Sequence, residues 1–327
     1  MKKRIALVTG GFTGESVISL KSAAVVEKNL DQERYEVYKI LITEEYWYHE
    51  DAKGQQFPID KNDFSFLLDG KKVTFDGVFN ILHGSPGEDG KLAGYFDMVG
   101  LPYTTCDAAT SAITMNKGYT KSIVQDIEEL KVAKSLHLLH NHTENKERVL
   151  KQLRLPLFIK PNNGGSSIGM SKVKSPDELQ PALDKAFQED DQVLVEEFVT
   201  GREFSVGAYR VGGKVTVLPS TEIISSKEFF DFEAKYTPGV TEEITPGRLT
   251  EEEVQRVNRI VEAIYLKLNC KGSVRVDYFL ETGTNDFYFI EINTVPGQTE
   301  TSLISQQVKA TGMELKEFYS ALIEEMF

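Results

Sequence analysis

The chain has 327 residues, enough for two or three domains, and it is 40% hydrophobic and 27% charged, as is typical of globular proteins with a buried core. A formal net charge of −13 argues against a broad nucleic-acid surface, which requires clustered Lys and Arg. No apolar stretch approaches the length of a membrane span, and the two cysteines, Cys106 and Cys270, cannot build a disulfide framework or a zinc site. We therefore expect a cytoplasmic protein that binds neither nucleic acid nor membranes.

Strands and helices alternate over the first third of the chain. The apolar run at 4–9 predicts a buried strand that ends in a "GGFTGE" turn. The elements predicted after it are a helix near 18–30, strands at 35–43 and 77–84, a helix near 91–99 and a short strand at 100–105. Strand, helix and strand at these spacings predict a Rossmann-like α/β domain over residues 1–105.

A different pattern begins after a predicted helix near 108–126. Short strands follow one another closely, which is typical of antiparallel sheets, and two helices have clear N-terminal signals. Ser175-Pro176-Asp177-Glu178 is a capping-box pattern with proline at the first helical position, and Thr250-Glu251-Glu252-Glu253 is a second one. We expect a central α+β domain over residues 106–190 and a larger C-terminal α+β domain over 191–327.

The predicted C-terminal domain contains an amphipathic helix and a hairpin. The helix that begins after Thr250 has one apolar face, formed by Val254, Val257, Ile260, Val261, Ile264 and Leu268. A hairpin at 273–293 and a helix near 313–326 complete the chain.

The stretch "IKPNNGGSSIGMSKV", residues 159–173, is similar to a nucleotide P-loop but lacks the lysine of that motif. Two glycines have the P-loop spacing, whereas Met170 stands where the lysine would be. "GMSKVK" is typical of a β-strand, so we expect the loop to join two antiparallel strands. Its backbone N–H groups and the hydroxyls of Ser166 and Ser167 can then close over phosphates, with Lys160 as the cation. The alternative is an ordinary glycine hairpin.

The C-terminal hairpin carries polar residues in a pattern that suits a metal ion. Arg275 and Asp277 are two positions apart and share one face of the first strand. Glu291 and Asn293 share a face of the second strand in the same way, and symmetry about Thr284 pairs Asp277 with Glu291. Facing carboxylates repel unless a cation lies between them, and these oxygen ligands suit Mg²⁺ shared with phosphate. The alternative is a solvated strand face.

Several motifs together resemble those of an ATP-grasp enzyme. They are the loop after Lys160, the strand "VRVDYFL" and the segment "EINTVPG". With "LHGSPGEDGKLAG" at 82–94 and "FDFEAKY" at 230–236, the chain resembles the D-alanine:D-alanine ligases from Thr9 to the C-terminal helix. The resemblance implies α/β and α+β architecture, with a Rossmann-like N-terminal domain followed by a two-subdomain ATP-grasp fold.

The resemblance implies a metal and nucleotide site. The metal ligands of the family fall on Asp277, Glu291 and Asn293, and the implied cofactors are ATP as co-substrate and two Mg²⁺ or Mn²⁺ ions. The positions implied to bind the nucleotide are Lys117, Lys160, Ser167, Glu196, Glu197, Val199 and Glu203.

The resemblance also implies where the amino-acid substrates bind. Glu15, Ser166 and Tyr236 fall on a hydrogen-bonded trio that fixes the first D-alanine and orders the loop over the site. Arg275 and the backbone N–H of Gly297 match an oxyanion hole, which stabilises a tetrahedral intermediate. The remaining substrate-binding positions are His83, Lys235, Ser302 and Leu303.

The implied activity is ATP-dependent ligation of two D-alanine molecules to D-alanyl-D-alanine through an acyl phosphate, for peptidoglycan precursors. Lys235 followed by Tyr236 goes with dipeptide formation in the family, so we expect D-alanine in both positions. Glu300, near the second-substrate region, departs from the family pattern. Family members are commonly homodimers, and a homodimer is expected here.

Three alternatives remain open. Another ATP-grasp carboxylate–amine or depsipeptide ligase, such as a D-alanine:D-lactate or D-alanine:D-serine ligase, would use the same motifs. A nicotinamide dehydrogenase built on "TGGFTG" is disfavoured because Thr9 replaces the first glycine of the dinucleotide fingerprint. A nucleotide-binding regulatory protein without turnover is disfavoured because the metal and oxyanion residues of the family pattern are all present.

Overall fold

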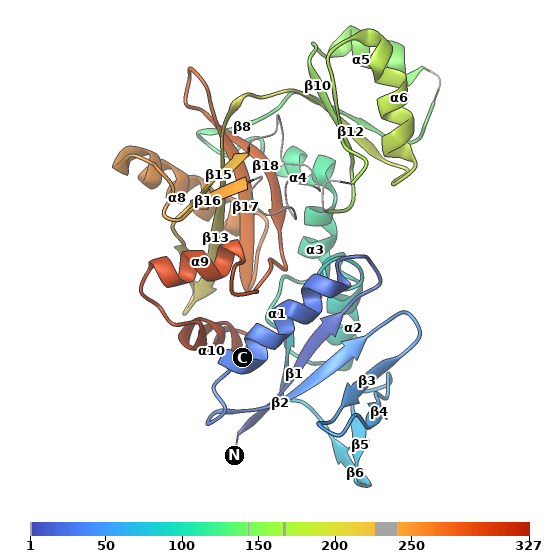
Figure 1. Cartoon of the computed structure of the whole chain (residues 1–327), viewed down its shortest axis with the longest axis vertical. Coiled ribbons are helices and arrows are strands. Elements are labelled where there is room, and N and C mark those ends of the chain that lie inside the picture. Colours follow the sequence, from blue (N-terminus) through green and yellow to red (C-terminus); the bar gives the residue numbers. More distant parts are fainter. Residues whose placement is uncertain (1, 143, 166–167, 226–240) are drawn as a thin grey trace.

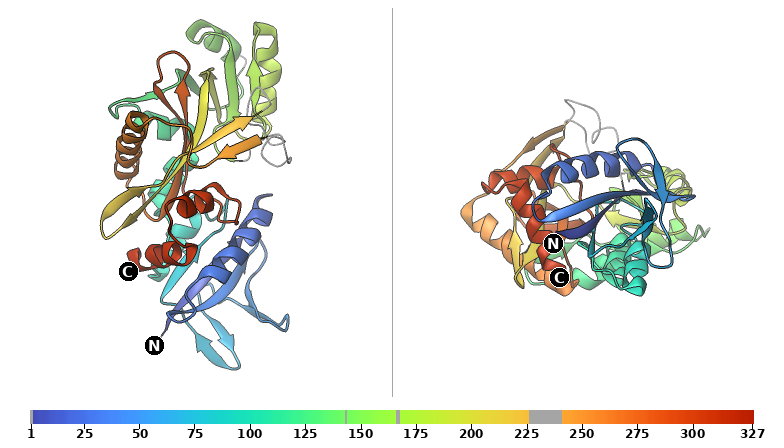
Figure 2. Two further views of the ribbon diagram at one scale, coloured as in Figure 1. Left: turned by 60° about the vertical axis from the view of Figure 1, so that its left-hand side comes forward. Right: turned by 90° about the horizontal axis from the view of Figure 1, so that it is seen from below.

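The computed structural model describes residues 2–142, 144–165, 168–225 and 241–327. Three larger sheets follow one another along an elongated molecule (Figure 1). The two ends of the chain meet, since the Lys3 ammonium lies 3.3 Å from the centre of the Phe327 ring (Figure 2). Within the described residues, no helix is long and apolar enough to cross a membrane.

The N-terminal sheet has the parallel core that the sequence predicts. Its strands are β1 (Lys3–Gly10), β2 (Tyr35–Ile42), β3 (Trp47–Glu50), β4 (Gln56–Pro58) and β7 (Gly77–Asn80). They lie in the order β4-β3-β2-β1-β7, and β1 is parallel to both β2 and β7. The N-terminal part also contains α1 (Ser16–Asn29), α2 (Lys91–Val99) and a separate hairpin of β5 (Phe66–Leu68) and β6 (Lys71–Val73).

The short strand predicted at 100–105 is wrong. This segment contributes an isolated parallel bridge between Val78 and Tyr103 and is assigned to no strand. Pro102 has no backbone N–H, so the segment cannot continue a regular ladder along β7.

The single helix predicted near 108–126 is also wrong, because two helices occupy this segment. They are α3 (Ala108–Met115) and α4 (Lys117–Val124). Asn116 between them is extended, and its side chain accepts a hydrogen bond from the Tyr119 N–H, so it caps the second helix. A short amide side chain favours such a cap over an interior helical position.

A small antiparallel sheet carries the Gly/Ser loop. Its strands are β9 (Ser135–Leu138), β10 (Leu157–Pro161), β11 (Ser171–Val173) and β12 (Val193–Glu197), in the order β11-β10-β12-β9. The antiparallel pairing of β10 with β11 confirms that the loop joins two such strands. Residues of α5 (Asn145–Gln152) and α6 (Pro176–Phe187) pack into the core of this sheet.

The first of the two predicted capping boxes is wrong. The helix begins at Pro176 as expected, but the Ser175 side chain makes no capping hydrogen bond. The Glu178 carboxylate instead accepts from the N–H of Lys174 at 2.7 Å, which satisfies a donor just outside the helix.

The largest sheet contains the acidic hairpin. Its strands are β8 (Leu130–Val132), β13 (Gly201–Val211), β14 (Lys214–Val217), β15 (Thr221–Ser225), β16 (Thr241–Ile244), β17 (Ser273–Glu281) and β18 (Phe287–Asn293). The main path is β16-β15-β13-β17-β18-β8, with β14 paired to β13. Strand β8 precedes the small sheet in sequence but pairs with β18, whereas β12 belongs to the small sheet. The domain boundaries themselves stay a prediction.

Helix α8 (Glu251–Lys267) packs on this sheet, and its predicted capping box is confirmed between Thr250 and Glu253. The predicted apolar face is buried except for Val254, which is 40% exposed; its placement on the core face is therefore wrong. Val254 lies in the first turn, where the helix begins at the surface.

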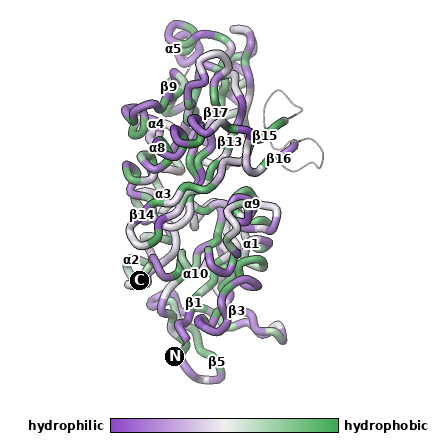
Figure 3. The backbone as a smooth tube through the Cα atoms, turned by 90° about the vertical axis from the view of Figure 1, so that its left-hand side faces the viewer, coloured by the Kyte–Doolittle hydropathy of each residue, from purple (hydrophilic) through white to green (hydrophobic). Residues whose placement is uncertain are grey.

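The last two helices are α9 (Leu303–Ala310) and α10 (Leu315–Glu325). Phe318 and Leu322 of α10 pack in one core with Ile5 of β1 and Val26 of α1, so the C-terminal helix returns to the N-terminal sheet. Hydrophobic stretches, green in Figure 3, alternate with hydrophilic ones along the chain, and α5 at the top of that view is largely hydrophilic.

Candidate active site

A cavity of about 1800 Å³ is lined by residues from the N-terminal part, the small sheet and the largest sheet. It is lined by all of the predicted site residues that the structure describes, namely Glu15, His83, Lys117, Lys160, Glu196, Glu197, Val199, Glu203, Arg275, Asp277, Glu291, Asn293, Gly297, Ser302 and Leu303. The four others, Ser166, Ser167, Lys235 and Tyr236, lie outside the described residues. Residues far apart in sequence thus share one cavity, although their individual roles stay predictions.

The acidic hairpin has the predicted register where it meets the cavity. Asp277 lies opposite Glu291, and Arg275 lies opposite Asn293. A bulge between Asp277 and Tyr278 shifts the pairing farther along the strands. The bulge leaves the four polar residues on the cavity side, because the regular pairing holds from the Asp277–Glu291 pair onward toward Asn293.

Asp277 is held in place by two neighbours. The Arg275 guanidinium donates two hydrogen bonds to its carboxylate, at 2.9 and 2.8 Å, and the Ser205 hydroxyl donates a third at 2.6 Å. Burial alone would lower the pKa of Arg275, but the charges of Asp277 and Glu291 raise it above its usual value. The guanidinium is therefore a fixed positive charge at the end of the hairpin.

Lys117 and Lys160 line the cavity from two different elements, α4 and β10. The Lys117 ammonium donates to the backbone oxygen of Gly164 at 2.6 Å and lies 3.4 Å from the Glu291 carboxylate. The Lys160 ammonium lies 2.7 Å from the Glu196 carboxylate. Both predicted phosphate-binding lysines therefore end among acidic or carbonyl oxygens of the cavity wall.

Lys121 is another lysine that lines the cavity, and the sequence analysis did not identify it. It is buried on α4 and contacts the other oxygen of the Glu196 carboxylate. Burial would raise the pKa of Glu196, but the charges of Lys121 and Lys160 outweigh it and lower the value to about 2. The sequence did offer one signal for Lys121: it follows Lys117 by four residues, which is about one helical turn, so both lysines lie on the same face of the helix.

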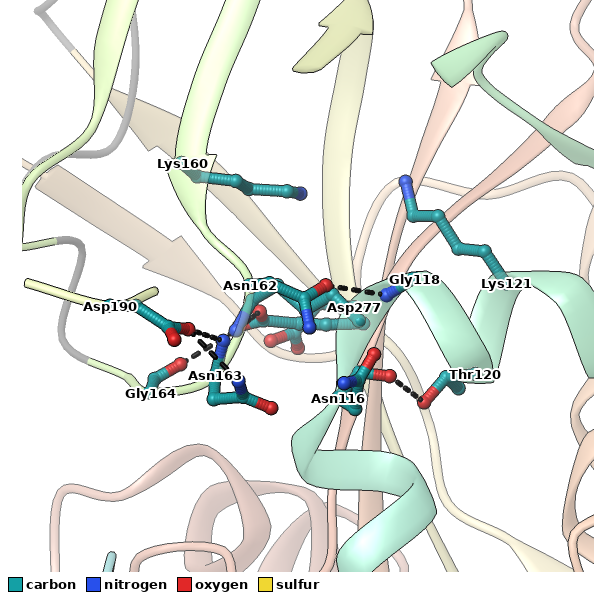
Figure 4. Close-up of polar contacts among 12 residues, drawn as sticks. Asn116, Gly118, Thr120, Lys121, Lys160, Asn162, Asn163, Gly164, Asp190 and Asp277 are labelled. Carbon is teal, nitrogen blue, oxygen red and sulfur yellow. Dashed lines mark hydrogen bonds and ion pairs between the residues drawn. The ribbon is translucent and has the colours of Figure 1, made fainter. Parts of the chain in front are cut away.

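Polar contacts join the loop after β10 to the start of α4 (Figure 4). The Asn162 side-chain oxygen accepts from the Gly118 N–H at 2.8 Å. Asn163 donates through its backbone N–H to Asp190 at 2.6 Å and through its side chain at 3.0 Å. The base of the Gly/Ser loop is thus hydrogen-bonded on both sides.

His83 is buried between the N-terminal sheet and the segment after β18. Its Nδ1 lies 2.6 Å from the Val295 oxygen, so Nδ1 carries the proton and donates. Nε2 lies 3.2 Å from the Ser22 hydroxyl and accepts from it in the neutral ring. Burial lowers the pKa of His83 to about 4, and the imidazole is neutral near pH 7.

Glu88 is a second cavity residue that the sequence analysis did not identify, although it lies in the quoted "GSPGEDGK" segment. Its carboxylate accepts from the N–H groups of Gly84, at 2.9 Å, and Val295, at 3.4 Å. Burial and the nearby charge of Glu15 raise the pKa of Glu88 to about 7. Glu88 therefore ties the loop of His83 to the end of the acidic hairpin.

Ser302 and Leu303, two of the predicted substrate-binding residues, lie where α9 begins. The Ser302 hydroxyl accepts from the Thr299 N–H at 2.9 Å, and a side chain at Gly297 would approach the Ser302 oxygen to 2.9 Å. Glycine therefore lets the backbone pass close to Ser302. Glu300 pairs with Lys28 at 3.4 Å on the surface and is not among the residues that line the cavity.

The carboxylates that face each other on the hairpin suit a divalent cation. Within the described residues, no group of three or more His, Cys, Asp or Glu forms a metal cluster. The predicted set has two carboxylates and one amide, Asp277, Glu291 and Asn293. Mg²⁺ binds through one or two carboxylates when phosphate oxygens and water complete its shell, so this smaller donor set fits it.

The two C-terminal sheets, with lysines and carboxylates around one cavity, agree with the ATP-grasp fold expected from the sequence, and solved structures share this fold. The chain superposes on the VanG D-Ala:D-Ser ligase from Enterococcus faecalis with a TM-score of 0.89, at 31% identity over 100% of both chains. It superposes on a D-alanine–D-alanine ligase from Bacillus anthracis complexed with ATP with a TM-score of 0.78, at 29% identity over 100% of this chain and 97% of the other.

The sequence identifies the family within this fold. Residues 4–106 match the family described as D-ala D-ala ligase N-terminus, and residues 126–324 match D-ala D-ala ligase C-terminus. A D-alanine–D-alanine ligase from Phocaeicola vulgatus is 43% identical over 100% of both chains. One from Parabacteroides distasonis is 44% identical over 99% of this chain and 98% of its own length. The chain belongs to the D-alanine–D-alanine ligase family.

Proposed function

We propose that this enzyme joins two D-alanine molecules to D-alanyl-D-alanine and converts ATP to ADP and phosphate. The observation that carries the proposal is the meeting of Arg275, Asp277 and Glu291 with Lys117 and Lys160 around one cavity. Relatives named D-alanine–D-alanine ligase match the chain over its whole length. The product would supply peptidoglycan precursors.

The first step activates a carboxyl group. A carboxylate oxygen of the first D-alanine attacks the γ-phosphorus of ATP, the bond to the ADP oxygen breaks, and an acyl phosphate forms. Lys117 and Lys160 would neutralise phosphate charge in this step. Mg²⁺, held by Asp277, Glu291 and Asn293, would supply further neutralisation of the phosphate oxygens when it is bound.

The second step forms the peptide bond. The amine of the second D-alanine attacks the acyl carbon, the tetrahedral intermediate collapses, and phosphate leaves. Arg275 and the Gly297 N–H would stabilise the oxyanion, and Asp277 keeps the guanidinium oriented through its two hydrogen bonds. The trio of Glu15, Ser166 and Tyr236 would hold the first D-alanine. Water would hydrolyse the acyl phosphate, so it must be kept from the site during this step.

Product analysis tests the proposal. The enzyme is incubated with D-alanine, ATP and Mg²⁺, and ADP, phosphate and dipeptide are measured. D-alanyl-D-alanine and ADP should form in equal amounts without any second acceptor. ADP release that requires another amine or hydroxy acid would reject D-alanine as the second substrate.

A D-alanine:D-serine ligase is the second candidate, because such an enzyme is among the similar structures. Lys235 and Tyr236, which favour the dipeptide, lie outside the described residues, so this preference rests on the sequence. Competition between D-alanine and D-serine at equal concentration decides between the two. Action in the cytoplasm and a homodimer stay predictions from the sequence.

A further inference from the structure

Three buried, charged side chains lie next to one another in the wall of the cavity. Lys121 on α4, Lys160 on β10 and Glu196 on β12 are each 5% exposed or less. Each oxygen of the Glu196 carboxylate has its own lysine: Oε1 accepts from Lys121, and Oε2 lies 2.7 Å from the Lys160 ammonium. Figure 4 shows the Lys121 and Lys160 ammonium ends entering the same space from the helix and from the strand. Two buried cations therefore share one buried anion.

The position of Lys160 conflicts with its proposed role. Lys160 is proposed to contact nucleotide phosphates, yet its ammonium is held by Glu196. Moving Lys160 to a phosphate would leave Glu196 as a buried carboxylate without a counter-ion, if no other cation were present. An unpaired buried charge is strongly unfavourable, so the exchange needs a second cation that stays behind.

We propose that Lys121 is a positioning residue that keeps Glu196 charged and in place while Lys160 exchanges this carboxylate for the nucleotide phosphates. The inference rests on the proposed function only in taking a nucleotide as the ligand. Lys121 holds the oxygen that Lys160 does not use, so it can remain bound throughout the exchange. The three groups together carry one excess positive charge, which the incoming phosphates neutralise.

The ionisation of the groups supports this arrangement. Burial lowers the pKa of Lys121 to about 8, even though the Glu196 charge opposes that change. The two lysines lower the pKa of Glu196 to about 2. Lys121 is therefore mostly protonated and Glu196 is ionised near pH 7, as the exchange requires.

The test measures binding of a nucleotide rather than turnover. Equilibrium titrations in Mg²⁺ without D-alanine give the affinities of the full-length enzyme for a non-hydrolysable ATP analogue and for adenosine. The ratio of the two affinities isolates the contribution of the phosphates. The variants are Lys121→Met, Glu196→Gln and the double variant, with Lys131→Met as the control because Lys131 is an exposed lysine on β8.

In Lys121→Met the affinity ratio should fall by about tenfold or more, which corresponds to about 1.4 kcal/mol. The affinity ratio falls because, among the residues that the structure describes, Lys160 is then the one cation paired with Glu196. Thermal unfolding without ligand should change little, because Glu196 keeps Lys160 as its partner. Lys131→Met should leave the ratio unchanged.

The double variant separates positioning from direct contact. With Gln at position 196 there is no carboxylate to neutralise, so Lys160 can move to the phosphates without Lys121. The ratio of the affinities for the ATP analogue and adenosine should therefore equal that of Glu196→Gln alone. A loss that persists in the double variant would mean that Lys121 contacts the phosphates itself, and would overturn the proposal. An unchanged ratio in Lys121→Met would also overturn it. Because binding is read directly, an enzyme that binds the analogue but makes no dipeptide would reject the proposed function and leave this inference standing.

Discussion

At the scale of single residues, the cavity depends on charged side chains that lie next to each other, such as Asp277 with Glu291 and Glu196 with Lys160. Their positions are predictable where they follow from a regular spacing. Asp277 and Glu291 face each other because side chains on a strand alternate with period two and the hairpin has a defined turn. Lys121 was missed because its importance depends on burial, and Glu88 because its importance depends on a half-buried place near Glu15, neither of which the sequence displays. The sequence alone does not distinguish an exposed lysine from a buried one.

Replacement of Glu291 by Gln tests the metal site. The amide keeps the shape of the side chain but removes the charge that would hold a divalent cation, so turnover should fall by roughly a hundredfold or more. Dipeptide formation and thermal unfolding are both measured. Glu281→Gln, at the far end of the same hairpin, is the control and should retain activity. Near-normal turnover in the first variant would count against the metal site.

His83 and Glu88 should give opposite dependences of stability on pH. The folded-state pKa of His83 is about 4, below its ordinary 6.5, so the unfolded state binds more protons and stability rises from pH 4 to 6.5. The folded-state pKa of Glu88 is about 7, above its ordinary 4.5, so stability falls from pH 4.5 to 7. Each effect is worth about 3 kcal/mol at most.

Single variants separate the two effects in denaturant titrations across this pH range. In Glu88→Gln the His83 effect remains, and the free energy of unfolding should rise more steeply with pH than in the wild type. In His83→Gln the Glu88 effect remains, and the free energy of unfolding should fall with rising pH when it is compared with that of the wild type. Identical pH profiles for the wild type and both variants would show that neither group is buried as described.

At the scale of elements, the start of a helix was predictable where a residue at that point has a direct effect on the backbone. The capping box at Thr250 and the proline at position 176 start their helices as predicted. The break at Asn116 was missed because no proline marks it, although asparagine is a favoured N-cap residue and caps α4 here. Pairing of β8 with β18 could not be predicted, since a three-residue strand has no periodicity to reveal its partner.

The turn between α8 and β17 depends on one glycine. Gly272 has a φ of +63°, and an added side chain would lie 1.8 Å from the backbone oxygen of Thr104. Gly272→Ala should therefore destabilise the fold by roughly 3 kcal/mol or more, since strain and a backbone clash add. Gly312→Ala is the matched control: its φ is +83° but its surroundings are open, so only the strain of about 1 kcal/mol applies. Denaturant unfolding measures both, and equal losses would contradict the role of the contact with Thr104.

At the scale of the whole molecule, the order of the sheets along the chain was predictable, but their mutual packing was not. The return of α10 to the N-terminal sheet joins the two ends of the sequence in one core, and this depends on contacts more than 280 residues apart, such as Arg34 with Glu324 at 2.8 Å. The cavity is lined by residues from the N-terminal part, the small sheet and the largest sheet, so it depends on how these three parts pack together.

A ligand that binds between the sheets should stabilise the whole molecule. The free energy of unfolding should rise with the concentration of an ATP analogue and Mg²⁺, by about 2.7 kcal/mol at a hundred times the dissociation constant. Thermal unfolding with and without Mg²⁺ measures this. In Glu291→Gln the Mg²⁺-dependent part should disappear. An equal shift in both enzymes would place the cation elsewhere.

The small sheet is one continuous insertion, since its strands run from β9 to β12 within residues 135–197. It is connected to the largest sheet through residues 133–134 on one side and 198–200 on the other. The two links lie side by side, because the N–H of Glu197 donates to the Lys134 oxygen at 2.9 Å. Two adjacent links allow rotation about a single axis, and four of these five residues, all but Lys134, line the cavity. A ligand bound there would sit at the pivot, where a small local shift swings the far edge of the insertion through the largest arc.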